Sequence, residues 1–133
     1  MEAKIAHLHM VQGVINRMAG NSFLLKGWSV TLISALFALA AAGANPLFVY
    51  LAYFPSFAFW ALDAYFLRQE RLFRKLHDRV RGQPESEIDF SMDTSDFESE
   101  VDSTYAVAFS KTLRLFHGTI VASIIVVTIV ITK

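Results

Sequence analysis

One acidic residue, Asp63, lies within the second long apolar stretch of the sequence, about one turn from its end, where an ionisable side chain is costly. Residues 28–62 carry no formal charge. A carboxylate in hydrocarbon normally faces a protein interior or water. At helical spacing Ser56, Trp60 and Asp63 share one face. Two interpretations stay open: this face lines a water path or meets polar groups of another helix, or Asp63 reaches the membrane interface and pairs with Lys26 or a following arginine.

A cluster of cations directly after this stretch is the second candidate site. Six of the twelve basic residues lie within residues 68–81, around an apolar helical stripe. Such cations at a membrane surface can bind anionic lipid, at about 1 kcal/mol each. They can also be neutralised by the acidic residues that follow, or bind the phosphates of a nucleotide or single-stranded oligonucleotide whose bases stack on Phe73 and His77. The candidate ligand-binding residues are Arg68, Arg71, Arg74, Lys75, Arg79 and Arg81.

Residues that could catalyse a reaction or bind a metal ion form no recognisable pattern. The sequence has no GxGxxG, P-loop, HExxH or nucleophile-elbow motif. His7 and His9 are two positions apart, so they lie on different faces of a helix, and both are interpreted as ordinary juxtamembrane polar residues. His77 and His117 have no identifiable carboxylate partner. The absence of cysteine excludes disulfides and thiolate metal sites. We therefore expect no enzyme, no metal site and no cofactor.

The elements that position these residues are predicted to cross a membrane. The 133 residues are 54% hydrophobic, with a mean hydropathy of +0.42. A helix needs about 20 mostly apolar residues to span a bilayer, and residues 23–42 and 46–67 both supply them. The turn between them is so short that the two helices must form an antiparallel hairpin. Pro55 removes a backbone donor and predicts a kink in the second helix.

A third apolar stretch ends the sequence and, extended back through Leu113, is also about 20 residues long; a buried strand is the competing interpretation. The sequence thus predicts an all-α membrane protein with three transmembrane helices, an amphipathic N-terminal helix and a basic cytoplasmic helical extension. The expected division is a cytoplasmic amphipathic helix at 1–21, a transmembrane hairpin at 22–67, a basic cytoplasmic helix at 68–82, an acidic cytoplasmic loop at 83–104 and the third transmembrane helix at 105–133.

Two boundaries of this division have alternatives. Asn21 and Ser22 can cap a new helix, or one helix can run straight through them. Eight of the twelve acidic residues lie within residues 85–102, where alternating apolar residues at 88–92 allow either a short strand or a flexible loop. The basic residues flank all three predicted spans on one side, and basic residues prefer the cytoplasm. The N-terminus is therefore expected in the cytoplasm and the C-terminus on the periplasmic side.

The segment HLHMVQGVINRMAGNSFLLKGW, the tight hairpin and the continuation YFLRQERLFRKLHDRVR together resemble small membrane effectors of bacterial anti-phage defence. Such effectors are encoded beside nucleotidyltransferases, as in CBASS-like and Hailong-like systems. The resemblance covers about residues 7–82 and is architectural. It implies an oligomeric channel of the bacterial inner membrane that stays silent until infection. It also implies gating by a nucleotide or DNA oligomer made by the partner nucleotidyltransferase.

Three helices cannot enclose an aqueous path within one subunit, so a conducting protein must be a homo-oligomer in the lipid bilayer. We expect a tetramer whose pore depolarises the membrane when open. Its second span, with Pro55, Ser56, Trp60 and Asp63, would line the pore or move during gating. The six cations would form a cytoplasmic collar for the ligand. The alternatives are a membrane-anchored adaptor that recruits a soluble partner, and a holin-like toxin that needs no ligand.

Overall fold

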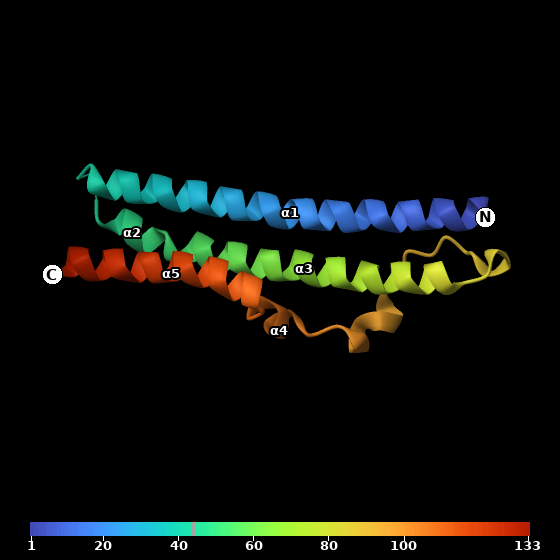
Figure 1. Cartoon of the computed structure of the whole chain (residues 1–133). Helices are drawn as coiled ribbons and strands as arrows, with labels where there is room; N and C mark the ends of the chain where they lie inside the picture. Colours follow the sequence, from blue (N-terminus) through green and yellow to red (C-terminus); the bar gives the residue numbers. More distant parts are fainter. Residues whose placement is uncertain (44) are drawn as a thin grey trace.

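The computed structural model describes residues 1–43 and 45–133, and its helices form an elongated antiparallel bundle (Figure 1). Residue 44, in the predicted hairpin turn, lies outside the described residues. The described residues form helices and no strand, which confirms the all-helical prediction and excludes a buried strand near the C-terminus. In chain order the elements are α1 (Glu2–Ala41), α2 (Leu47–Leu51), α3 (Tyr53–Gly82), the 3₁₀ turns η1 (Glu85–Glu87) and η2 (Ser95–Glu100), α4 (Thr104–Ala108) and α5 (Lys111–Thr132).

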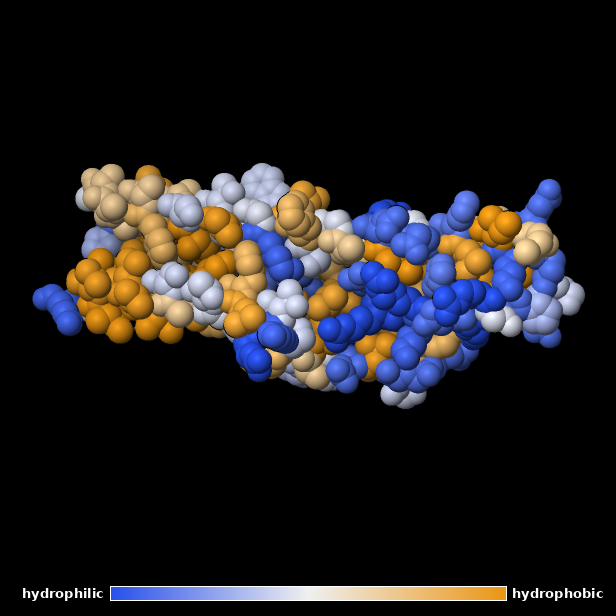
Figure 2. All heavy atoms as spheres, viewed as in Figure 1, coloured by the Kyte–Doolittle hydropathy of each residue, from blue (hydrophilic) through white to orange (hydrophobic). Residues whose placement is uncertain are grey.

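Three helical segments are long and apolar enough to cross a membrane, as predicted. They are α1, α2 with α3, and α5. Within their most apolar windows only 11%, 28% and 11% of the residues, respectively, are buried. Phe54 is 81% exposed and Val130 is 66% exposed. So much exposed apolar surface would be unfavourable in water and is typical of helices solvated by lipid. Figure 2 shows this surface concentrated at the end of the bundle where α5 packs.

The first helix runs without interruption from Glu2 to Ala41, so the alternative of one continuous helix is the observed one. At 1.5 Å per residue its 40 residues are about 60 Å long. This is about twice the hydrocarbon thickness of a bilayer. Gly43 follows the helix with φ of +80°, a left-handed conformation that glycine adopts without steric cost. One continuous helix therefore includes both the N-terminal segment and the first predicted span.

The predicted irregularity near Pro55 is present, three residues before the proline. At Ala52 one irregular turn separates α2 from α3, although its backbone keeps helical angles, with φ of −64° and ψ of −24°. Pro55 has no N–H to donate to the carbonyl of Leu51, four residues earlier. The hydroxyl of Ser56 donates to the carbonyl of Tyr53 at 2.8 Å and so does not replace that lost donor. Beyond this break α3 continues for 30 residues to Gly82.

Separate apolar clusters hold the two ends of the bundle together. At the end with the N-terminus, residues of α1, α3 and η2 form one cluster: Val11, Ile15, Leu72, Leu76, Val80 and Phe97. At the opposite end Ile33, Val49, Ala52 and Ile124 form another. The two termini lie at opposite ends of the bundle (Figure 1).

The segment between α3 and α5 lies against the side of the bundle. Residues 88–94 have no regular secondary structure, so the strand alternative is wrong. The segment passes through η2 and the short α4, which the hydroxyl of Ser103 caps by accepting from the amide of Ala106. A break at Phe109 and Ser110 separates α4 from α5. The last long helix therefore starts at Lys111, later than the sequence division at residue 105.

Candidate functional site

A buried polar cluster joins α1, α3 and α5 around the carboxylate of Asp63. Asp63 is completely buried. Its Oδ2 lies 2.6 Å from Nζ of Lys26 and 2.7 Å from Nε2 of His117. Its Oδ1 accepts a hydrogen bond from the hydroxyl of Ser22, which in turn accepts one from Lys26 at 2.8 Å. The carboxylate of α3 thus binds two polar side chains of α1 and one of α5.

His117 is the member of this cluster that sequence reasoning missed. It is 1% exposed, and its ring stacks on Trp60 with 5.8 Å between the ring centroids. Its Nδ1 is buried and has no hydrogen-bond partner among the described residues. The indole N–H of Trp60 donates to the carbonyl of Ala108 at 2.7 Å. Trp60 therefore connects the polar cluster to α4.

The structure shows one part of each interpretation of Asp63. Its side chain pairs with Lys26, and it also meets polar groups of two other helices, Ser22 and His117. Ser56, on the same face, is 1% exposed. Both Ser56 and Asp63 thus lie inside the helices of a single subunit. A water path lined by these side chains would require α1, α3 and α5 to separate around them.

The six predicted ligand-binding cations all lie on α3, and the structure gives them different partners. Arg79 pairs with Asp96 at 3.2 Å, and its guanidinium lies 5.1 Å from the ring centroid of Phe97. Arg68 donates to the carbonyl oxygens of Asp102, at 3.0 Å, and Glu98, at 3.4 Å. The segment after α3 therefore does contact the basic helix, as the neutralisation interpretation expects.

The remaining cations are paired within α3 or form no ion pair. Arg74 pairs with Glu70 at 2.7 Å, and Arg81 lies 3.5 Å from Asp78. Within the part of the chain that the structure describes, Arg71 and Lys75 form no ion pair.

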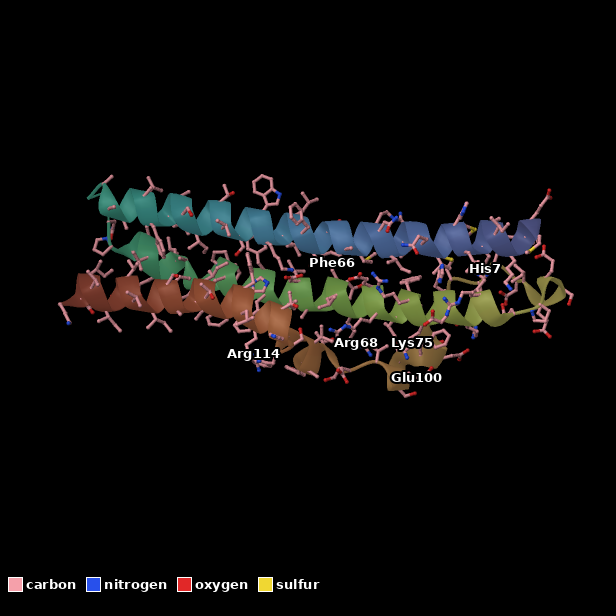
Figure 3. The ribbon with its side chains drawn as sticks, viewed as in Figure 1. His7, Phe66, Arg68, Lys75, Glu100 and Arg114 are labelled. Carbon is pink, nitrogen blue, oxygen red and sulfur yellow. The ribbon has the colours of Figure 1, made fainter. Side chains whose placement is uncertain are left out.

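An open pocket of about 280 Å³ lies between α3 and residues 100–102, which connect η2 to α4. Figure 3 shows Arg68 and Lys75 on the side of α3 that faces Glu100. Cationic and anionic side chains meet around the pocket, which is lined by Arg71, Arg74, Lys75, Asp78, Glu100, Val101 and Asp102. Its cations attract small anions, but carboxylates line the same pocket.

The beginning of the acidic segment is held on the first turns of α1. The side chain of Glu85 lies 2.8 Å from the N-terminal ammonium group and accepts hydrogen bonds from the amides of Ala3 and Lys4. The hydrogen bond to the ammonium group, with those two amides, holds the pKa of the Glu85 carboxyl below its ordinary value.

His7 holds the next part of the segment. It is fully buried, and its Nε2–H donates to the carbonyl of Ser91 at 2.8 Å, while its ring packs beside Phe90. The sequence interpretation of His7 as an ordinary juxtamembrane residue missed this contact. His9, by contrast, is exposed. Among the described residues no group of three or more acidic or histidine side chains is placed to hold a metal ion.

Comparisons with known proteins leave this site to be interpreted from its chemistry. No protein-family model, no curated protein and no solved structure matches the chain.

Proposed function

We propose that this chain is the subunit of a homo-oligomeric, ligand-gated ion pore of the bacterial inner membrane. The observation that carries the proposal is the Asp63–Lys26–His117 cluster, buried among helices long and apolar enough to span a bilayer. Ionisable side chains at such positions are costly, and they generally mark ion or proton pathways. A cluster of this kind is a candidate gate because opening it would expose three polar side chains to water.

Two features support movement of α3 during gating. The missing N–H of Pro55 and the irregular turn at Ala52 weaken the backbone hydrogen bonding between α2 and α3, and helices bend at such positions. Asp63 lies eleven residues after this break on an uninterrupted helix. Tilting α3 about the break would draw Asp63 away from Lys26 on α1 and from His117 on α5. The closed state would then be the one in which the cluster is intact.

The basic helix supplies the ligand site of the proposed pore. In a tetramer the six cations of each α3 would give about two dozen positive charges at the cytoplasmic side. A phosphate-bearing ligand would reduce their mutual repulsion and favour one spacing of the subunits. It can gate only if it binds the open and closed states with different affinity. A nucleotide or oligonucleotide made by a partner nucleotidyltransferase, in anti-phage defence, would meet this need.

Ion flux through liposomes that contain the purified protein tests the proposal. We expect flux that responds to short single-stranded DNA oligomers and a change in gating for the variant Asp63→Asn. No flux under any condition would reject the pore and favour the membrane-anchored adaptor. Flux that is indifferent to oligonucleotides would reject the ligand and favour a holin-like toxin.

The ligand site has its own matched pair of variants. Reversing Arg71 and Lys75 to glutamate removes two cations that form no ion pair among the described residues, so it should abolish the response to oligonucleotides while the subunits still assemble. Reversing Lys111 and Arg114, two exposed cations of α5, makes the same change of charge away from the pocket. An equal effect of both pairs would show that net charge, rather than the pocket on α3, controls gating.

A further inference from the structure

Acidic residues of the same chain already contact the basic part of α3. We propose that residues 95–102 act as a built-in competitor that occupies the α3 surface until a soluble, extended polyanion of the single-stranded oligonucleotide class displaces them. The inference rests on the proposed function for its gating consequence. The competition itself is a separate property and can be measured by binding.

The strongest support comes from the way η2 contacts Arg79. The carboxylate of Asp96 lies 3.2 Å from the guanidinium, and the aromatic ring of the next residue, Phe97, lies 5.1 Å from it. An oligonucleotide offers the same pair of groups, an anionic phosphate and an aromatic base, to an arginine. Asp96 and Phe97 therefore use the two contacts through which Arg79 would bind a nucleotide.

The contacts continue along α3 toward the membrane. Glu100 and Asp102 line the same pocket as Arg71, Arg74 and Lys75. Arg68 binds the backbone carbonyl of Asp102 at 3.0 Å. From Arg68 to Arg79 the cations cover eleven residues of helix, or about 16 Å. This is the length of an extended chain of a few nucleotides, and it is too long for a single phosphate or mononucleotide to cover.

The same length argues against a lipid headgroup as the ligand. Arg68 directly follows the apolar part of α3, so it can reach the membrane surface. Arg79 is about 16 Å further from the membrane along the helix axis. Attraction to anionic lipid falls off within a Debye length of about 8–10 Å. A membrane could therefore neutralise Arg68, but a soluble polyanion is needed to reach Arg79.

The competitor is held by polar contacts that a polyanion can replace and by a single buried apolar side chain. Asp96 is 76% exposed, so its ion pair with Arg79 is accessible and screened by salt. Phe97 is the one buried side chain of η2, packed on the apolar stripe of α3. The segment is also tied down further upstream, where Glu85 and His7 hold it on α1. Displacement of residues 95–102 would thus leave the segment tethered close to the helix and able to rebind.

A binding experiment with a matched control tests the competition. The probe is a fluorescein-labelled oligothymidylate of six nucleotides, and the readout is fluorescence anisotropy with detergent-solubilised protein at fixed salt. Asp96→Asn with Glu100→Gln should tighten binding by at least about 2- to 5-fold, because loss of the exposed ion pair of Asp96 with Arg79 alone shifts the equilibrium by such a factor, and Glu100→Gln removes a further negative charge from the pocket. Glu2→Gln with Glu87→Gln removes the same charge away from α3 and should leave the affinity unchanged.

A spin label distinguishes displacement from a general charge effect. The chain has no cysteine, so Ser99→Cys gives a single labelling site on exposed η2. Saturating oligothymidylate should increase the mobility of a nitroxide at this site, whereas a label on Ala19→Cys of α1 should not respond. Absence of oligonucleotide binding, or binding that leaves the label at residue 99 immobile, would overturn the proposal. Mobilisation by anionic lipid vesicles, but not by oligothymidylate, would overturn it in favour of a membrane ligand.

The two proposals fail in different ways. Tighter binding and a mobile label without ion flux would reject the pore and keep the competitor. Ligand-responsive flux with an unchanged affinity of the Asp96 and Glu100 variant would reject the competitor and keep the pore.

Discussion

Removal of the Lys26 ammonium is the most informative perturbation of the polar cluster. In Lys26→Met an unbranched apolar chain of similar length replaces lysine, so packing changes little. Asp63 stays fully buried and retains Ser22 and His117 as donors, but it loses the cation 2.6 Å from its Oδ2. Breaking a buried ion pair from one side costs about 3–5 kcal/mol. The two remaining donors place the expected loss of unfolding free energy at the lower end, about 3 kcal/mol.

The complementary variant should cost less because lysine can relax. Asp63→Asn keeps the shape of the side chain and leaves Lys26 without its anion. The side chain of Lys26 is already 21% exposed and can extend toward the membrane surface. We therefore expect a loss of about 1–2 kcal/mol. The double variant should lose no more than Asp63→Asn alone, so the two changes should be non-additive by at least about 2 kcal/mol.

Unfolding in mixed detergent micelles, followed by tryptophan fluorescence, measures these differences. Lys111→Met is the matched control, since it removes an exposed cation of α5 that forms no ion pair among the described residues. Interhelical hydrogen bonds in membranes average about 0.6 kcal/mol, so a coupling near 2 kcal/mol identifies a charge pair. Additive losses, or a loss in Lys26→Met no greater than in Lys111→Met, would refute the argument that a buried ion pair holds the three helices together.

Three further predictions test other parts of the molecule. The backbone amide of Ser95 donates to the carboxylate of Asp93 and lowers the pKa of that carboxyl group, so the ionised group stabilises the acidic segment at any pH above its ordinary pKa of 3.8. This stabilisation is lost as the pH falls through the lowered pKa, and hydrogen exchange of the amides in residues 93–100 should then become faster. Trp60→Phe removes the donor to the carbonyl of Ala108 and should cost about 1 kcal/mol, with faster proteolysis between α4 and α5; an unchanged cleavage rate would reject the role of Trp60 in holding α4. In cells, Lys133→Cys should react with an impermeant thiol reagent, while Ser99→Cys should react only after permeabilisation; labelling of residue 99 but not residue 133 from outside would show the reverse orientation, and labelling of both would reject a third span between them.

The three long apolar helices were predictable because their signal is local. An uncharged stretch of residues predicts a spanning helix whatever lies around it, and Pro55 disrupts the backbone through its own missing donor. The pairing of Asp63 with Lys26 was also predictable, because a tight hairpin brings the start of one predicted span beside the end of the next. The length and hydropathy of the apolar stretches, together with the short turn between the first two, were sufficient to predict the spans and this pairing.

The partner of His117 was not predictable in this way. Which residue of α5 faces Asp63 depends on the path of the intervening segment from residue 83 to residue 110, and that segment has no periodic pattern. The irregular contacts of His7 with Ser91 and of Arg79 with Phe97 depend on the same path. A signal for part of it was present: Ser103 and Ser110 are good N-cap residues and could have located the starts of α4 and α5.

The location of the polar cluster between the apolar and charged halves of the bundle connects the two proposals. Between Tyr53 and Gly82 the helix α3 is continuous, so its 30 residues, about 45 Å, can move as one rod about the break at Ala52. A force applied at Arg79 acts about 40 Å from that break, and Asp63 lies about 16 Å from it. A 3 Å displacement at Arg79 would then shift Asp63 by roughly 1 Å by simple lever geometry. That shift is enough to lengthen hydrogen bonds of 2.6 and 2.7 Å beyond their normal range. We therefore expect exchange of the acidic segment for a ligand to be felt at Asp63 through the rigidity of α3, with no need for a separate pathway of contacts.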